Sequence, residues 1–355
     1  MPDSIHQQPI EQRIDWLLQL SQTHSQHFCD PENYLARESY LARHPTSIIA
    51  LKCMDGRIHL PYATQTPLGI VRPFRNLGGI FDLGWPYMGD LLADSVGTAI
   101  NAGRQVLVII TYHYSKGDPH RGCAGFNCDT QAARAHAEQI RSQVEQIFGL
   151  GHQTVYPLVC GFETDEDALI LHGPEDKQLD VSTLALADES RLPALVGSVL
   201  TDMPQRILND LLPLVKGNLR HIHALRQTQR ELDIEHREWM ICVGRGFDFL
   251  HAPNVALIIG PYSPDLSDPI RKAAGIIRAN MDKGRIPGDG FLLLSSAPYE
   301  QPGPDQARAE LKAHFMADFA AQVIRQADPQ LAEKMRRHTA SLHWPTRRLN
   351  LLDSQ

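Results

Sequence analysis

The chain has 355 residues and a formal net charge of −7, and its 34 Lys and Arg residues are dispersed rather than gathered in one patch. Without a basic patch there is no electrostatic footprint for nucleic acid or for an anionic membrane surface, and both are excluded as partners. No stretch approaches about 18 uninterrupted apolar residues, and the start lacks a basic segment followed by an apolar one, so a cytoplasmic protein is expected.

The length favours two domains rather than one. The six cysteines are too sparse for the disulfide framework of a secreted protein, so reduced thiols that are free to bind metal are expected. The 17 histidines are many, and most of them are expected to be ordinary surface or core residues.

The first 45 residues predict a helical arm with a break at Asp30-Pro31. Residues 46–185 then alternate strands with helices. Strands are expected at 47–53, around 69–72, at 106–112 and at 155–160, and helices at 88–102 and 130–147. The continuous apolar run at 106–112 is typical of a strand buried on both faces. An α/β domain with a mainly parallel sheet flanked by helices is therefore predicted.

Residues 186–235 predict a helical connector, and residues 236–355 repeat the earlier order before a C-terminal tail. Expected elements here are strands at 239–245, 255–259 and 291–296 and a helix at 269–281. Cys53 precedes His113 by 60 positions, and Cys242 precedes Pro298 by 56, which suggests a duplication. The second copy has Gly244 where the first has Asp55, and it has no His or Cys at its strand end, so a degenerate copy without metal is expected.

The run Cys53-Met54-Asp55-Gly56-Arg57 directly follows the first apolar strand. Alternate side chains of an extended segment share a face, which groups a thiolate, a carboxylate and a guanidinium. The run is a plausible zinc half-site, and a core cysteine beside a surface ion pair is the alternative.

His113 and Cys123 follow the buried strand, where sites form in open α/β sheets. Cys123 returns through a short loop whose closure costs little entropy. Two thiolates and one imidazole leave the fourth position of a tetrahedral zinc to water, as in catalytic sites. His120 competes with His113 for the ligand role, but the strand end fixes the direction of His113. Cys128 is interpreted as incidental.

The ordered motifs Cys53-x-Asp55-x-Arg57, Arg75-Asn76-Leu77-Gly78-Gly79 and the pair His113 and Cys123 resemble those of the β-class carbonic anhydrases. The resemblance covers residues 46–185. In the usual members the His and the second Cys share a tight His-x-x-Cys turn, whereas here they are ten positions apart. This departure, the helical N-terminal part and the degenerate second copy resemble the divergent carboxysome shell carbonic anhydrases.

The resemblance implies reversible hydration of CO₂ to bicarbonate by a zinc-bound hydroxide. It assigns Cys53, His113 and Cys123 as zinc ligands and Asp55 as the acceptor from the hydroxide. Arg57 would keep Asp55 ionised and turned from the metal, which is sensible because opposite charge lowers a carboxylate pKa; its release would let Asp55 close the site. Further site residues are Arg75 and Asn76 with structural roles, and Phe74 and Tyr112 as walls of a CO₂ pocket, although core packing explains either aromatic equally well.

Two rival functions remain. One is a zinc hydrolase of the same fold that acts on another small substrate such as CS₂. The other is a silent zinc-bound scaffold with Asp55 or Cys128 as fourth ligand. A homo-oligomer is expected, as is an association with carboxysomes, although attachment to a shell is in doubt because the chain is shorter at its N-terminal end than those proteins.

Overall fold

The computed structural model describes residues 3–228, 235–245 and 252–354. The chain divides into two compact units. The β1–β6 unit comprises residues 36–53 and 58–234, and the β7–β11 unit comprises residues 1–35, 54–57 and 235–355. The short segment 54–57, which directly follows Cys53, therefore belongs to the unit that holds both chain ends.

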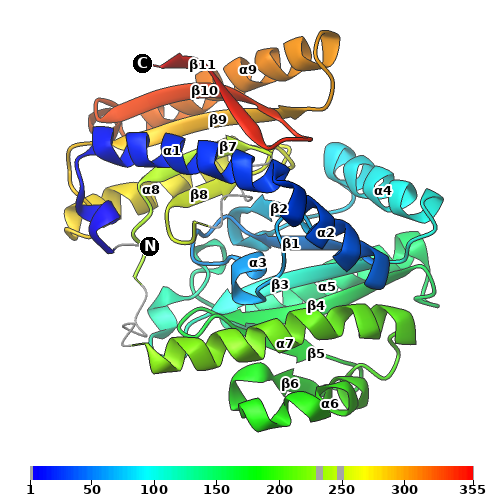
Figure 1. Cartoon of the computed structure of the whole chain (residues 1–355). Helices are drawn as coiled ribbons and strands as arrows, with labels where there is room; N and C mark the ends of the chain where they lie inside the picture. Colours follow the sequence, from blue (N-terminus) through cyan, green and yellow to red (C-terminus); the bar gives the residue numbers. More distant parts are fainter. Residues whose placement is uncertain (1–2, 229–234, 246–251, 355) are drawn as a thin grey trace. The chain divides into compact units, whose positions relative to one another are not determined.

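The β1–β6 unit is built on a six-stranded sheet of order β2-β1-β3-β4-β5-β6 (Figure 1). The first four strands in this order are parallel, and β5 and β6 are antiparallel to their neighbours. The strands are β1 (Ser47–Cys53), β2 (Val71–Asn76), β3 (Val106–Tyr114), β4 (Val155–Glu163), β5 (Ala168–His172) and β6 (Gln178–Asp180).

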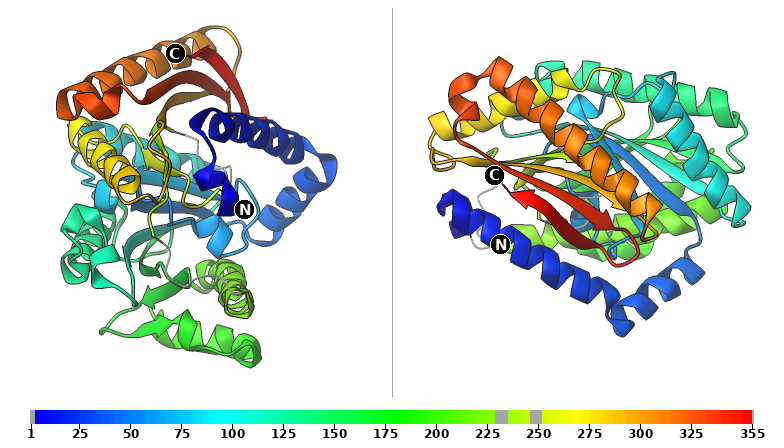
Figure 2. Two further views of the ribbon diagram at one scale, coloured as in Figure 1. Left: turned by 90° about the vertical axis from the view of Figure 1, so that its left-hand side faces the viewer. Right: turned by 90° about the horizontal axis from the view of Figure 1, so that it is seen from above.

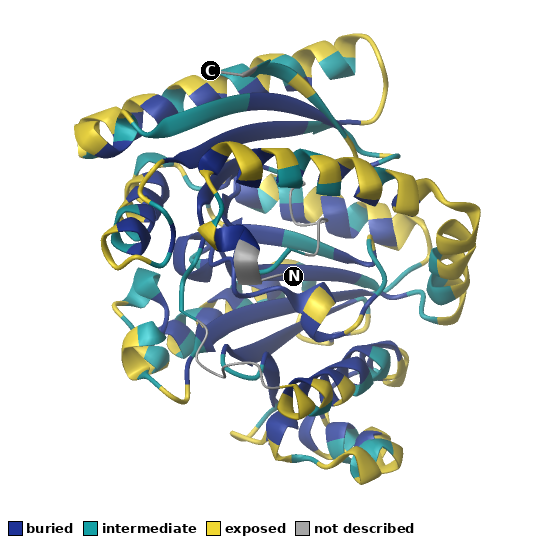
Figure 3. Ribbon diagram, turned by 60° about the vertical axis from the view of Figure 1, so that its left-hand side comes forward, coloured by how far each residue is buried: buried dark blue, intermediate teal, exposed yellow. Residues whose placement is uncertain are grey.

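Helices connect and cover these strands: α2 (Pro31–Arg43), α3 (Leu60–Ala63), α4 (Pro86–Asn101), α5 (Thr130–Phe148), α6 (Leu192–Val199) and α7 (Gln205–Gln227). α5 packs on β3 and β4, and α7 packs on β5. The Asp129 carboxylate caps α5 by accepting from Ala132 N–H. Every residue of β4 is buried, and every residue of β3 except the last is buried as well. The sheet therefore forms the core, and the helices expose their outer faces (Figure 3).

The β7–β11 unit is built on a five-stranded sheet of order β11-β10-β9-β7-β8. Its strands are β7 (Met240–Gly244), β8 (Ala256–Ile259), β9 (Phe291–Tyr299), β10 (Met335–His343) and β11 (Arg348–Ser354). Its helices are α1 (Ile10–Cys29), α8 (Ser267–Asp282), α9 (Pro304–Ala327) and α10 (Pro329–Ala332). α9 lies along β9 and β10 (Figure 2). The buried Arg13 of α1 donates to Asp289 at 2.7 Å, which fastens the arm to this unit.

The two sheets share one topology. β8-β7-β9-β10-β11 repeats the order and the strand directions of β2-β1-β3-β4-β5, including the antiparallel last strand. The predicted degenerate second copy is confirmed, but its alignment is corrected. When β3 and β9 are aligned end to end, Leu107 matches Leu292. Ile48 pairs with Leu107 and Met240 pairs with Leu292, so Ile48 matches Met240. Cys53 then matches Arg245 rather than Cys242. His113 matches Pro298, as the sequence predicts.

The predicted α/β class is confirmed, but some elements are not predicted from the sequence. Two of these are β5 and β6, which follow the predicted strand at 155–160. No element is predicted after residue 296, and this part of the chain forms α9, α10, β10 and β11. Among the described helices, none combines the length and the apolar character that crossing a membrane requires.

Candidate metal centre

Three side chains that the sequence singles out converge inside the β1–β6 unit. The Sγ atoms of Cys53 and Cys123 and a ring nitrogen of His113 all lie within 4.8 Å of one another. All three residues are buried, with exposed fractions of 5% for Cys53, 1% for His113 and 2% for Cys123. The cluster offers two sulfur ligands and one nitrogen ligand to a single ion.

The ends of β1 and β3 bring Cys53 and His113 together. Cys53 is the last residue of β1, but the pairing of β1 with β3 stops at Leu51 and Ile110. Gly79 occupies the gap that opens, since a Cβ on it would lie 3.2 Å from Thr111 O and 3.4 Å from Cys53 N. Gly79 also has a φ of +67°, which a residue with a side chain rarely adopts.

A close contact between two glycines places Cys123. It precedes the short 3₁₀ turn Ala124–Phe126, and this turn packs on the turn Leu77–Gly79. A Cβ on Gly125 would lie only 2.6 Å from Gly78 Cα. The motif Leu77-Gly78-Gly79 thus provides the surface against which the Cys123 loop rests, because backbone meets backbone with no room for a side chain.

Arg75 and Asn76 bind backbone carbonyls. Arg75 is buried and donates from Nη1 to Cys53 O at 3.1 Å and from Nη2 to Ile58 O at 2.7 Å, which fixes the chain on both sides of residues 54–57. Asn76 Nδ2 donates to Ile80 O at 2.8 Å. These contacts agree with structural roles for the two residues.

The loop between His113 and Cys123 is tied to the turn after β4. The Asp165 carboxylate accepts from Ser115 Oγ at 3.0 Å and from Gly117 N at 2.8 Å. His120 is exposed within this loop and does not belong to the three-residue cluster. Cys128 is also outside the cluster, and its Sγ donates to His120 O at 3.2 Å.

The chemistry of the cluster fits zinc. Burial raises the pKa of the Cys53 thiol well above its ordinary value, the neighbouring Cys123 raises this pKa further, and His113 lowers it. Two thiolates could not be buried here without a compensating positive charge. Zn²⁺ supplies that charge, and it prefers thiolate and imidazole ligands in this number when a fourth position is left for water.

Asp55 and Arg57 form a second group, within the β7–β11 unit. Arg57 donates from Nε to Asp55 Oδ1 at 3.1 Å and from Nη2 to Asp55 Oδ2 at 2.7 Å, a bidentate pair. Their exposed fractions are only 4% and 3%, so the alternative of a surface ion pair is wrong. Met54 O accepts from Ile258 N of β8, and Gly56 O accepts from Asn254 N just before β8, so two backbone hydrogen bonds hold this segment beside β8.

Residues 38–192 match the family model described as Carboxysome Shell Carbonic Anhydrase, catalytic domain. This stretch is a carbonic anhydrase domain of the carboxysomal type. A solved structure titled "The structure of the beta-carbonic anhydrase CcaA" is similar at 13% identity and a TM-score of 0.28, over 48% of this chain and 91% of that one. No curated protein matches the chain.

The carbonic anhydrase domain uses its two candidate pocket aromatics in the core. Tyr112 and Phe74 are buried, and Tyr112 OH shares a hydrogen bond of 2.8 Å with His172 Nε2 on β5. Adjacent strand residues point to opposite faces, so Tyr112 points away from the side taken by His113. The described contacts of Tyr112 therefore do not support its predicted role as a wall of the CO₂ pocket.

Two residues that sequence reading missed lie beside Asp55. His236 Nε2 is 3.7 Å from Asp55 Oδ2, and His236 Nδ1 is 3.0 Å from both oxygens of Glu238. The alternation His236-x-Glu238 before β7 was the available signal. Nothing in the sequence joined it to Asp55, 181 positions earlier (236 − 55).

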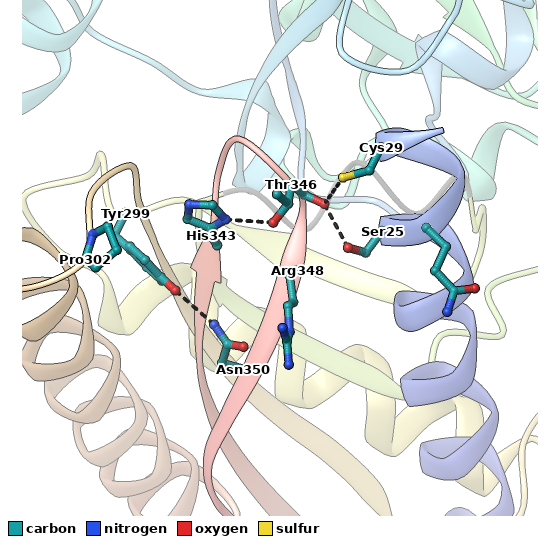
Figure 4. Close-up of a pocket in the computed structure, with 9 residues that line it drawn as sticks. Ser25, Cys29, Tyr299, Pro302, His343, Thr346, Arg348 and Asn350 are labelled. Atoms are coloured by element: carbon teal, nitrogen blue, oxygen red, sulfur yellow. Dashed lines mark hydrogen bonds between the residues drawn. The ribbon is translucent and has the colours of Figure 1, made fainter. Parts of the chain in front are cut away.

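One described cavity lies outside the carbonic anhydrase domain. It has a volume of about 440 Å³ and is formed by α1, the end of β9 and the β10–β11 hairpin. Figure 4 shows Ser25 and Cys29 of α1 directed at Thr346 O, and Asn350 Nδ2 bonded to Tyr299 OH. The residues that line it include none of the predicted site residues.

Proposed function

We propose that the chain catalyses the reversible hydration of CO₂ to bicarbonate with one zinc ion held by Cys53, His113 and Cys123. The family match and the fold support CO₂ hydration in general terms. The observation that carries the zinc assignment is the burial of two thiols and one imidazole with their ligand atoms within 4.8 Å of one another.

Zinc, when bound, lowers the pKa of water toward neutrality and so supplies a hydroxide nucleophile, a general property for which carbonic anhydrase is itself the standard example. The roles of the chain's own residues follow from the resemblance. Asp55 accepts a hydrogen bond from the nucleophile and so directs it at CO₂. Arg57 keeps Asp55 ionised through its bidentate contact. The burial of the pair strengthens this contact relative to a solvated one.

The family match also suggests the setting. We propose that the protein acts in the cytoplasm in association with carboxysomes, and as a homo-oligomer. Size-exclusion chromatography with light scattering measures the oligomeric state, and co-sedimentation with purified carboxysomes measures the association. A monomer that remains in the supernatant contradicts both parts.

Zinc content and CO₂ hydration in the pure protein, measured together, test the proposed activity. About one zinc per chain with CO₂ hydration by stopped-flow is expected, and Asp55→Asn should keep the zinc while kcat falls about 10²–10⁴-fold, the usual contribution of general acid–base groups. Full zinc loading without CO₂ hydration at any pH or redox state contradicts it. Turnover of CS₂ instead would favour the zinc hydrolase, and a fourth protein ligand in place of water would favour the scaffold.

A further inference from the structure

A fully buried carboxylate lies next to the Asp55 turn in the β7–β11 unit. Glu238 has no exposed surface, and its Oε1 accepts from Gly56 N at 3.1 Å. A Cβ on Gly56 would lie 2.7 Å from Ala256 O and 3.0 Å from Glu238 Cγ. Glu238 therefore holds the backbone between Asp55 and Arg57 at a point where the chain has no room to shift.

His236 connects Glu238 to Asp55. Its Nδ1 lies 3.0 Å from both Glu238 oxygens, which orients the ring and directs Nε2 to Asp55 Oδ2 at 3.7 Å. The imidazole thus lies between the carboxylates of Asp55 and Glu238, and Asp55 Oδ2 is in contact with both His236 and Arg57.

Packing alone does not account for this arrangement. An apolar residue of similar volume would fill the place of Glu238 without the cost of burying a charge. Burial by itself raises the pKa of Glu238, but the adjacent His236 and Arg57 together outweigh burial, so the pKa of Glu238 lies below its ordinary value. The Glu238 carboxylate is placed where it accepts from Gly56 N and contacts His236 Nδ1.

We propose that His236 and Glu238 are positioning residues for Asp55, supplied to the reaction by the degenerate second copy. This rests on the proposed function, in which Asp55 directs the nucleophile. His236 and Glu238 keep the Asp55 carboxylate in its contact with Arg57. Without them, Asp55, only two residues from Cys53 in the chain, becomes free to leave Arg57 for the metal.

Two charged residues of this segment, Glu235 and Arg237, have described contacts with other residues. Glu235 pairs with Arg285 at 2.7 Å. Arg237 is linked through its backbone, its N donating to Asn254 Oδ1 and its O contacting His6 Nδ1. Among the contacts described for His236, the charged partners are therefore the carboxylates of Asp55 and Glu238.

The test uses the full chain with five variants: His236→Ala, His236→Gln, Glu238→Gln, the double variant His236→Ala with Asp55→Asn, and the control His314→Ala. His314 is a matched control because it also faces a carboxylate, Asp353 at 3.6 Å, and lies in the same unit. Measurements are zinc content, thermal unfolding, kcat and KM for CO₂, and the visible absorption spectrum of the Co²⁺-loaded protein, which reports ligands at the metal independently of activity.

His236→Ala and Glu238→Gln should lower kcat about 10–100-fold, as loss of an outer-shell partner of a metal site does, with KM and zinc content little changed. The Co²⁺ spectrum should change in His236→Ala and return to that of the native chain in the double variant with Asp55→Asn. His236→Gln, which keeps a hydrogen-bond donor, should lose less.

The proposal is overturned if His236→Ala matches His314→Ala in kcat and leaves the Co²⁺ spectrum unchanged. If His236→Ala fails to fold, the same comparison is made with His236→Gln and Glu238→Gln. A native chain that binds zinc without hydrating CO₂ would remove the proposed function, and the Co²⁺ spectra would still decide whether His236 controls Asp55.

Discussion

Substitution of Cys128 and of the two candidate ligand cysteines distinguishes a zinc site with three protein ligands from a site with four. Cys53→Ser and Cys123→Ser should each remove zinc and CO₂ hydration, with a loss greater than the about 10–100-fold expected for an outer-shell contact. Cys128→Ser should keep about one zinc per chain and its activity, because its thiol is outside the cluster. Zinc analysis by mass spectrometry and stopped-flow assays measure both. Zinc loss in Cys128→Ser would favour a closed structural site.

Glu163, at the end of β4, gives the stability of the β1–β6 unit a pH dependence. Burial raises its pKa to about 7 from an ordinary value of 4.5, although Lys116 N, Asp165 N and Glu166 N donate to it. The folded protein then binds more protons than the unfolded chain between these values, so this contribution to stability is present below pH 4.5 and is lost as pH rises toward 7.

Urea unfolding of the native chain and of Glu163→Gln between pH 4.5 and pH 8 isolates this effect. The native chain should lose stability relative to the variant as pH rises. Parallel curves across this range would show that Glu163 ionises with its ordinary pKa.

At the scale of single residues, the sequence was informative where local order fixes a side chain. The buried strand predicted the place of His113, and the strand end predicted that of Cys53. Cys123 needed the resemblance as well, because its position depends on the contact of Gly125 with Gly78 across 47 positions (125 − 78). His236 and Glu238 escaped notice because their partner lies on a distant segment.

Among the elements, the two short turns Leu77–Gly79 and Ala124–Phe126 set the geometry of the metal centre. Gly125→Ala should push these turns apart, destabilise the protein by about 1–3 kcal/mol, as overpacking typically does, and weaken zinc binding. Gly97→Ala is the matched control, since a Cβ there meets nothing within 4 Å and α4 gains a better helix former. Zinc titration and thermal unfolding compare the two, and equal zinc affinity would show that this contact does not place Cys123.

The elements that could be predicted from the sequence were those with one clear pattern of apolar residues. β1 and β3 read as strands because nearly every residue is apolar and buried. β10 begins Met335-Arg336-Arg337-His338, all half-buried, and such a polar start hid the strand from a search for apolar runs. β6 has only three residues, too few for any pattern.

For the whole molecule, the two copies of one topology have separate roles in this account. The first contains the three residues proposed to bind zinc, while the second has Arg245 and Pro298 at the positions that match Cys53 and His113. Removal of zinc by a chelator should therefore increase hydrogen exchange in β1, β3 and the loop to Cys128, and leave β10 and β11 protected. Mass spectrometry of peptides measures this, and a uniform increase across both sheets would show that zinc stabilises the chain as one unit.

In the proposed metal centre, two sulfurs, one imidazole and one water hold a single zinc ion. X-ray absorption at the zinc edge of the purified protein tests it most directly. The account predicts two sulfur ligands at about 2.3 Å and two nitrogen or oxygen ligands at about 2.0–2.1 Å. A shell with three or four sulfurs, or with none, would contradict it.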